Sequence, residues 1–214
     1  MNIDIKLLVA DDHPMLLKGL VDELTTHGFN VLPGARNGAQ ALDMISQELP
    51  DIAILDINMP LLSGFEVIKK CKEKQLRTKF IVLTSYKEKA YILKAHALNI
   101  SGYLLKDEPF HEIKKCIQTV YNGASYFSSV FNNVLNEQVA PQLAKIKYLS
   151  PSELTIVRMI LQGKNSKAIS EQLSISIRTV QKHRSNIIAK LDLSSDSDAL
   201  ATWVLENKAL LNIL

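Results

Sequence analysis

Five short apolar runs alternate with helix-like stretches along residues 1–125, and this alternation restricts the fold more than any other feature of the sequence. The runs are rich in β-branched residues and cover residues 5–10, 31–32, 52–55, 80–83 and 103–105. Their hydrophobicity is continuous rather than alternating, which indicates strands of a sheet that is covered on both faces. We therefore expect a doubly wound, five-stranded parallel α/β sheet in residues 1–125.

The alternation of strands and helices stops after this region. Residues 126–147 carry only a weak helical pattern that several asparagines and Pro141 interrupt, so we interpret them as a linker. Residues 148–214 show no strand pattern, and Ser150 followed by Pro151 is typical of a helix start. Further helices are expected at 166–173, 177–191 and 197–207, which predicts a small all-α domain.

Composition excludes several classes of protein. No run of 18 apolar residues occurs, and the N-terminus lacks the pattern of a signal peptide, so we expect a cytoplasmic protein that does not enter membranes. The two cysteines, Cys71 and Cys116, lie singly in helix-like patterns, which argues against a disulfide framework or a zinc site.

Polar residues stand directly after four of the five predicted strands. Asp11 and Asp12 follow the first strand, Asp56 the third, Thr84 the fourth and Lys106 the fifth. In a doubly wound sheet the functional site lies beyond the carboxyl ends of the strands, so these side chains are expected to converge. Three converging carboxylates repel one another, and a hard divalent cation such as Mg²⁺ would relieve this.

This arrangement suits phosphoryl chemistry. A phosphoryl group on Asp56 would meet the positive charge of Lys106 and the hydroxyl of Thr84. Taken alone, each residue has a simpler explanation, because a single aspartate after a strand is most often a turn former or a helix cap. The coincidence of residue type with position at four strand ends favours a site.

The segments that carry these residues resemble the receiver domain of two-component response regulators, which has a flavodoxin-like fold. They read V-A-D-D-H-P, L-D-I-N-M-P with Gly64 behind it, V-L-T-S and G-Y-L-L-K-D, all in order within residues 3–125. The resemblance implies that a cognate sensor histidine kinase phosphorylates Asp56. It also implies a set of Mg²⁺ ligands, namely Asp11, Asp12, Asp56 and the backbone carbonyl of Asn58.

The same resemblance identifies switch residues. Thr84 and Lys106 match the hydroxyl and the lysine that hold the phosphoryl group, and Tyr103 matches the aromatic residue that moves when Thr84 moves. For an aromatic residue in a strand, core packing is the simpler alternative for Tyr103.

A helix pair with a basic outer surface lies in the second domain. The predicted helices 166–173 and 177–191 are joined by a short turn, which is the outline of a helix-turn-helix. Lysine and arginine neutralise phosphates, and glutamine pairs with adenine. A solvated amphipathic helix is the alternative explanation.

Here the motifs L-S-P-S-E-L, K-A-I-S-E-Q-L-S-I-S and R-T-V-Q-K-H resemble the LuxR-type helix-turn-helix over residues 149–211. A receiver joined to such a domain is the layout of the NarL/FixJ subfamily. The resemblance implies that Gln181, Lys182 and Ser185 face DNA bases. It implies phosphate contacts for a second set, Lys167, Arg178, Thr179 and Lys190. Asp196 departs from the family pattern, which has a basic residue there.

The last predicted helix offers an apolar side made of Leu200, Trp203 and Val204. In the subfamily this helix often pairs two subunits, and a dimer predicts a two-fold symmetric DNA site. The alternative is that these three residues cover the core of the small domain.

The charge is unevenly distributed, although the whole chain carries only +3. Residues 1–125 hold 15 basic and 15 acidic side chains, whereas residues 145–190 hold 9 basic and 2 acidic ones. A net +7 in the latter segment is an electrostatic signature of DNA binding.

These observations predict a response regulator whose phosphorylation on Asp56 controls DNA binding and transcription, as a homodimer when phosphorylated. A regulator of this kind is not an enzyme. Two alternatives remain open: a Mg²⁺-dependent phosphohydrolase that forms an aspartyl phosphate, and a receiver that works without phosphorylation.

Overall fold

The computed structural model describes residues 5–194, 196 and 198–211. The chain divides into two compact units, Met1–Asn133 and Val134–Leu214, and each is considered by itself. Ser197, at the expected start of the last helix, lies outside the described residues.

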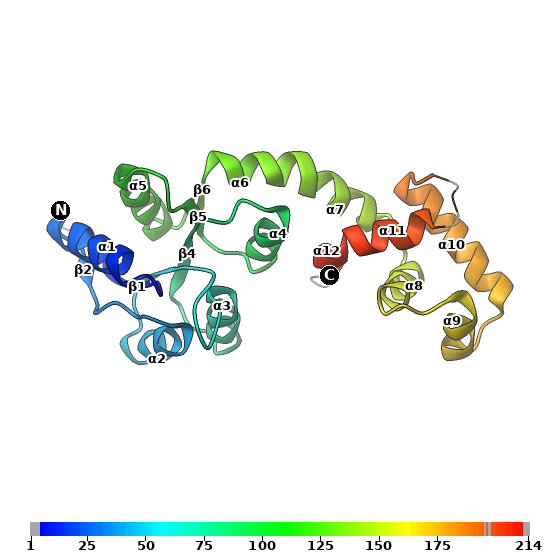
Figure 1. The fold of residues 1–214 in the computed structure, drawn as a ribbon, viewed down its shortest axis with the longest axis horizontal. Helices are drawn as coiled ribbons and strands as arrows, with labels where there is room; N and C mark the ends of the chain where they lie inside the picture. Colours follow the sequence, from blue (N-terminus) through cyan, green and yellow to red (C-terminus); the bar gives the residue numbers. More distant parts are fainter. Residues whose placement is uncertain (1–4, 195, 197, 212–214) are drawn as a thin grey trace. The chain divides into compact units, whose positions relative to one another are not determined.

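The first unit is built on a parallel sheet with strand order β2-β1-β3-β4-β5-β6 (Figure 1). Its strands are β1 Lys6–Ala10, β2 Asn30–Val31, β3 Ile52–Leu55, β4 Lys79–Thr84, β5 Gly102–Leu105 and β6 Tyr126–Phe127. The sixth strand corrects the expected number of five. It consists of two residues paired with Gly102 and Tyr103 of β5, and a segment so short carries no recognisable periodicity.

Helices cover both faces of this sheet. They are α1 Pro14–Thr26, α2 Gly38–Glu48, α3 Gly64–Glu73, α4 Lys89–Ala97 and α5 Phe110–Tyr121. Side chains of α1 and α5 share one core cluster with alternate residues of the strands. Helices α2, α3 and α4 lie on the other side (Figure 1). Burial on both faces explains why the central strands β3 and β5 are continuously apolar.

A close approach fixes the turn that leads into α3. Ser63 and Glu66 form a capping box at the start of the helix. A Cβ atom on Gly64 would lie 2.2 Å from the backbone oxygen of Asp56, so only glycine fits there. The backbone N–H of Gly64 donates to the carbonyl of Ile57 at 2.9 Å, which folds the loop back onto the end of β3.

The expected linker, residues 126–147, has regular structure over most of its length. It contains β6, α6 Ser129–Val134, the π-helical turn η1 Leu135–Val139 and α7 Ala140–Lys147. The second unit continues with α8 Pro151–Leu161, α9 Ser166–Leu173, α10 Ile177–Leu191, α11 Ala199–Glu206 and α12 Lys208–Leu211. None of the helices in the described part of the chain is long and apolar enough to cross a membrane.

Helices α9 and α10 have the bounds that the sequence predicts. The side chains of Asn165 and Ser176 cap their N-termini, and Ser174, the residue after the last one of α9, adopts a left-handed conformation. Their apolar sides meet in a core that includes Ile169, Val180 and Ile187. The polar side of α10 is therefore left to solvent.

Candidate functional site

Asp11 and Asp56 lie side by side because β1 and β3 pair up to their last residues, with Ala10 opposite Leu55. The backbone N–H of Asp56 donates to the carbonyl of Ala10 at 2.9 Å. The strand order reverses at β1, and sheets of this type bind ligands at such a switch point. Both aspartates are buried, with 2% and 5% of their surface exposed.

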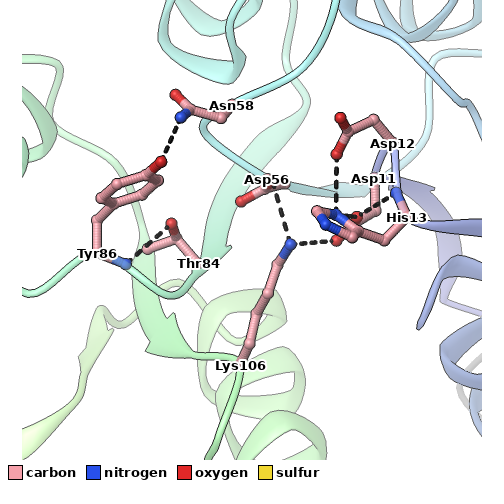
Figure 2. Close-up of polar contacts among 8 residues, drawn as sticks. All are labelled: Asp11, Asp12, His13, Asp56, Asn58, Thr84, Tyr86 and Lys106. Atoms are coloured by element: carbon pink, nitrogen blue, oxygen red, sulfur yellow. Dashed lines mark hydrogen bonds and ion pairs between the residues drawn. The ribbon is translucent and has the colours of Figure 1, made fainter.

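Lys106, directly after β5, joins these two carboxylates. Its Nζ lies 2.7 Å from Oδ2 of Asp11 and 3.1 Å from Oδ2 of Asp56 (Figure 2). Burial acts to lower the pKa of Lys106, but the hydrogen bond to Asp11 and the charge of Asp56 outweigh it, so this pKa is raised. Burial also raises the pKa of Asp56, and Lys106 offsets that only in part. The lysine is thus a fixed positive charge at the acidic site.

Asp11 and Asp56 belong to a group of four potential metal ligands. Ligand atoms of Asp11, Asp12, His13 and Asp56 all lie within 4.8 Å of one another. The Nδ1 atom of His13 is 3.0 Å from Oδ1 of Asp12, but the imidazole is largely exposed. Carboxylate oxygens are the ligands that Mg²⁺ prefers, whereas imidazole suits transition metals. The three carboxylates therefore fit a hard divalent cation.

Thr84 stands at the end of β4 and is fully buried. Its Oγ1 accepts a hydrogen bond of 3.3 Å from the backbone N–H of Tyr86 (Figure 2). The hydroxyl of Tyr86 accepts a hydrogen bond from the side-chain amide of Asn58, and its ring stacks on Tyr91 with centroids 4.3 Å apart. Tyr86 thus connects the loops after β3 and β4 beside the acidic site.

Tyr103 in β5 is also buried, with 1% of its surface exposed. Its hydroxyl donates a 2.7 Å hydrogen bond to the backbone carbonyl of Tyr86. The peptide units around Tyr86 are therefore bonded to Thr84 on one side and to Tyr103 on the other. The structure thus brings Asp11, Asp12, Asp56 and Lys106 together at the carboxyl edge of the sheet, where Thr84 ends β4. Tyr103 lies within β5 and is connected to Thr84 through Tyr86.

The outer side of α10 carries the residues that the sequence singles out. Four side chains on it are exposed: Arg178, Gln181, Lys182 and Ser185. Thr179 is exposed too, but its Oγ1 is 2.8 Å from Oγ of Ser176, within the N-terminal cap. Lys167 in α9 is exposed. The outer side of α10 is thus exposed and carries positive charge, as the DNA-contacting helix of a helix-turn-helix does.

Lys190 differs from the other basic residues of α10. Its Nζ lies 2.7 Å from Oε2 of Glu153, which is 3% exposed at the start of α8. Burial acts to raise the pKa of Glu153, but hydrogen bonds from Lys190 and Ser150 outweigh it, so this pKa is lowered. The positive charge of Lys190 is therefore partly neutralised by a carboxylate of the second unit itself.

The apolar side of α11 points into the second unit. Leu200 and Val204 are completely buried, and 6% of Trp203 is exposed. The indole Nε1 of Trp203 donates to Oε1 of Gln142 in α7 at 3.3 Å. These three side chains thus form part of the core of the unit. Leu205 is the apolar residue of α11 that is exposed, at 67%.

Sequence reasoning missed Tyr86, His13 and Glu153. Tyr86 and His13 lie within two residues of predicted site residues, so proximity in sequence was an available signal. Glu153 stands three residues after Ser150 in a capping-box pattern, but the sequence does not indicate its pairing with Lys190, which is 37 residues away.

Comparison with known families gives two matches along the chain. Residues 7–118 match the response regulator receiver domain, and residues 147–202 match the luxR family of bacterial regulatory proteins. Similar curated proteins span most of the chain. The oxygen regulatory protein NreC of Staphylococcus haemolyticus is 31% identical, and the alignment covers 96% of this chain and 99% of that protein. The transcriptional regulatory protein MctR of Rhizobium johnstonii is 34% identical, with 89% of each covered.

Solved structures agree in fold. The RcsB response regulator of Salmonella typhimurium has a TM-score of 0.66 at 23% identity and covers 94% of this chain and 100% of its own. The receiver domain of a putative response regulator NarL from Mycobacterium tuberculosis has a TM-score of 0.54 at 34% identity, covering 56% of this chain and 98% of its own.

Proposed function

The chain belongs to the response regulators that join a receiver domain to a LuxR-type DNA-binding domain, and from this premise we propose that phosphorylation of Asp56 controls its binding to promoter DNA. The contact of Lys106 with Asp11 and Asp56 carries this proposal. This contact holds the nucleophilic carboxylate of Asp56, the neighbouring carboxylate of Asp11 and the positive charge of Lys106 together at the carboxyl edge of the sheet. Relatives of this family regulate transcription in two-component signal transduction.

The proposed partner is a sensor histidine kinase that carries a phosphohistidine. An Oδ atom of Asp56 attacks the phosphorus, the P–N bond of the donor breaks, and the imidazole leaves as the acyl phosphate forms. Lys106 then neutralises one phosphoryl oxygen, and the hydroxyl of Thr84 donates to another. Thr84 is buried at the end of β4, and its Oγ1 accepts a hydrogen bond from the N–H of Tyr86, which leaves its own proton available for donation.

We infer that Mg²⁺ is held by Asp11, Asp12, Asp56 and the backbone carbonyl of Asn58. The fit of the three carboxylates to a hard cation supports this assignment. When bound, the ion supplies positive charge that stabilises the transferring phosphoryl group. The carboxylates of Asp11 and Asp12 serve to hold the ion, while that of Asp56 also serves as nucleophile.

For the second unit we propose that α10 enters the major groove. In this arrangement the bases are contacted by Gln181, Lys182 and Ser185, and the phosphates by Lys167, Arg178, Thr179 and Lys190. Lys190 is expected to contribute less to phosphate binding, because its charge is partly neutralised by Glu153. The exposure of the first three and the net +7 of residues 145–190 support this interface. A chain that works on promoter DNA is expected in the cytoplasm.

A homodimer of the phosphorylated chain is the expected DNA-binding form, on a roughly two-fold symmetric site. Dimers bound to DNA are described for RcsB. Because Leu200 and Val204 are buried in the monomer, a dimer surface on α11 would have to use other side chains, such as the exposed Leu205.

Acetyl phosphate with Mg²⁺ tests the site directly on the full chain. We expect one phosphoryl group per wild-type chain, none on Asp56→Asn, and unchanged labelling of Asp22→Asn, whose carboxylate lies on the exposed side of α1. Stoichiometric labelling that persists in Asp56→Asn would overturn the assignment. Steady hydrolysis of a phosphate ester over many turnovers would favour the phosphohydrolase, and DNA binding without any labelling would favour the phosphorylation-independent receiver.

A further inference from the structure

The exposed surface of α10 begins with an apolar side chain. Ile177, the first residue of the helix, has 44% of its surface exposed. Of the large apolar side chains that are exposed in the described part of the chain, it is the one that lies in α9 or α10. Single exposed apolar residues are common on protein surfaces and need no function by themselves. Whether Ile177 has a role therefore depends on its neighbours.

Ile177 stands in one row with two residues that are proposed to face DNA bases. Residues four positions apart lie next to one another on a helix, so Ile177, Gln181 and Ser185 follow each other along one side of α10. Gln181 and Ser185 are exposed, and Oγ of Ser185 donates to the backbone carbonyl of Gln181 at 3.2 Å. A helix that carries Gln181 into the major groove therefore carries Ile177 with it.

The start of α10 is stabilised without the side chain of Ile177. The Oγ of Ser176 accepts the backbone N–H of Thr179 at 3.0 Å and so caps the helix. The two positions that form a hydrophobic staple around such a cap are occupied by Ile175 and the buried Val180. An acidic residue would suit the helix dipole in this first turn, and α10 has none there. An isoleucine at position 177 is therefore not needed to start the helix.

The major groove of DNA offers an apolar group that fits such a side chain. Among the four bases, only thymine carries a methyl group there. Isoleucine is β-branched and has one strongly preferred χ1 rotamer in a helix, so it loses little rotamer entropy when it makes a contact. Burial of one methyl group changes an affinity roughly three- to fivefold, which is enough to select one base over another.

We propose that Ile177 is a specificity-determining residue of α10, which contacts the C5 methyl group of a thymine beside the base that Gln181 faces. This inference rests on the proposed function of α10 in DNA binding. Four residues of a helix span about 6 Å along its axis, and successive base pairs are about 3.4 Å apart. The thymine is therefore expected within about two base pairs of the position that Gln181 contacts.

The experiment uses the full chain with acetyl phosphate and Mg²⁺, which selects a site from duplex DNA of random sequence. Each thymine of the selected site is then replaced in turn by deoxyuridine, which lacks the C5 methyl group but keeps the hydrogen-bonding groups of the base. We expect one replacement per half-site to weaken binding by wild type roughly three- to fivefold. The same replacement should leave the affinity of Ile177→Ala unchanged, whereas Ile177→Val, which keeps a branched side chain, should stay sensitive to it.

Tyr148→Ala is the matched control, because Tyr148 is 72% exposed in the second unit but lies outside α9 and α10. Its response to deoxyuridine should be that of wild type. Gln181→Ala should lose its base preference within about two base pairs of the sensitive thymine, and a larger separation would contradict the proposed contact.

Two further results would overturn the role of Ile177 while leaving DNA binding intact. One is a selected site in which no thymine is sensitive to deoxyuridine, and the other is equal sensitivity of wild type and Ile177→Ala. Absence of duplex binding by wild type would instead overturn the proposed function of α10.

Discussion

The Nζ atom of Lys190, in the last turn of α10, lies 2.7 Å from Oε2 of Glu153 in the first turn of α8. The same carboxylate oxygen accepts the backbone N–H of Ser150, also at 2.7 Å. One buried carboxylate thus closes the capping box of α8 and fixes the end of the basic helix. Because of this pairing, we expect substitution of Lys190 to affect the stability of the second unit more than substitution of the exposed basic residues of α10.

Lys190→Met is expected to destabilise the second unit by about 1–3 kcal/mol, because Glu153 would remain buried with one partner missing. The lower part of this range is favoured because 38% of the Lys190 side chain is exposed. Trp203, the single tryptophan of the chain, lies in this unit, so urea unfolding followed by its fluorescence measures the effect. Lys182→Met, at a solvent-exposed position, is the control and should unfold like wild type; equal midpoints for both variants would contradict the structural role of Lys190.

Glu153→Gln should make the stability of the second unit less dependent on acid pH. The folded-state pKa of Glu153 is lowered from its ordinary value of 4.5, so its charge stabilises the fold above that value and this contribution is lost as pH falls through the folded pKa. The wild type should therefore lose its advantage over Glu153→Gln as pH falls from about 6 to below 4.5. Unfolding midpoints across this interval test the prediction, and a constant difference would contradict it.

Arg178→Ala should weaken DNA binding and lower the slope of log affinity against log salt by about 1, the effect of one lost phosphate neutralisation. Because phosphate contacts do not depend on sequence, any duplex serves, and fluorescence anisotropy at several salt concentrations gives the slope. Lys190→Met should lower the slope less, since Glu153 already partly neutralises that charge. An unchanged slope for Arg178→Ala would remove this residue from the interface.

The grouping of Asp11, Asp12 and Asp56 was predictable because these residues follow strands, and strand register then determines their positions. Asp11 and Asp56 are adjacent because Ala10 and Leu55 pair, and a run of apolar residues is enough to indicate both strands. Helices α9 and α10 were predicted with their bounds because Asn165 and Ser176 are strong caps.

Contacts that depend on tertiary packing were not predictable from the sequence. Strand β6 is two residues long, and its pairing with β5 depends on the turn after α5 rather than on a pattern. The contact of Phe131 with Tyr103 joins residues 28 positions apart, and both are ordinary core aromatics by sequence. The pairing of Lys190 with Glu153 was also not predictable. The sequence of a helix with several basic residues does not show which of them forms an ion pair within its own domain.

Gly64→Ala and Gly19→Ala should have opposite effects on the receiver. A Cβ on Gly64 would meet the backbone oxygen of Asp56 at 2.2 Å, so we expect a loss of about 1–3 kcal/mol and slower acetyl phosphate labelling of the displaced Asp56. A Cβ on Gly19, inside α1, meets nothing within 4 Å, so alanine there should add about 0.5–1 kcal/mol. Thermal unfolding and labelling of both variants test this, and similar behaviour of the two would contradict the close approach at Gly64.

Lys106→Met should bind Mg²⁺ more tightly than wild type and yet respond poorly to phosphorylation. The ammonium of Lys106 contacts Asp11 and Asp56, so it competes with a cation for the same carboxylates. If the competition costs Mg²⁺ binding about 1 kcal/mol, removal of the ammonium should raise the Mg²⁺ affinity roughly three- to tenfold. Calorimetric titration of Mg²⁺ measures this change. The control is Lys87→Met, because Lys87 pairs 3.0 Å from the exposed Asp107 and should not affect the ion. Weaker Mg²⁺ binding by Lys106→Met would show that the lysine supports the metal site, and the competition would then be wrong.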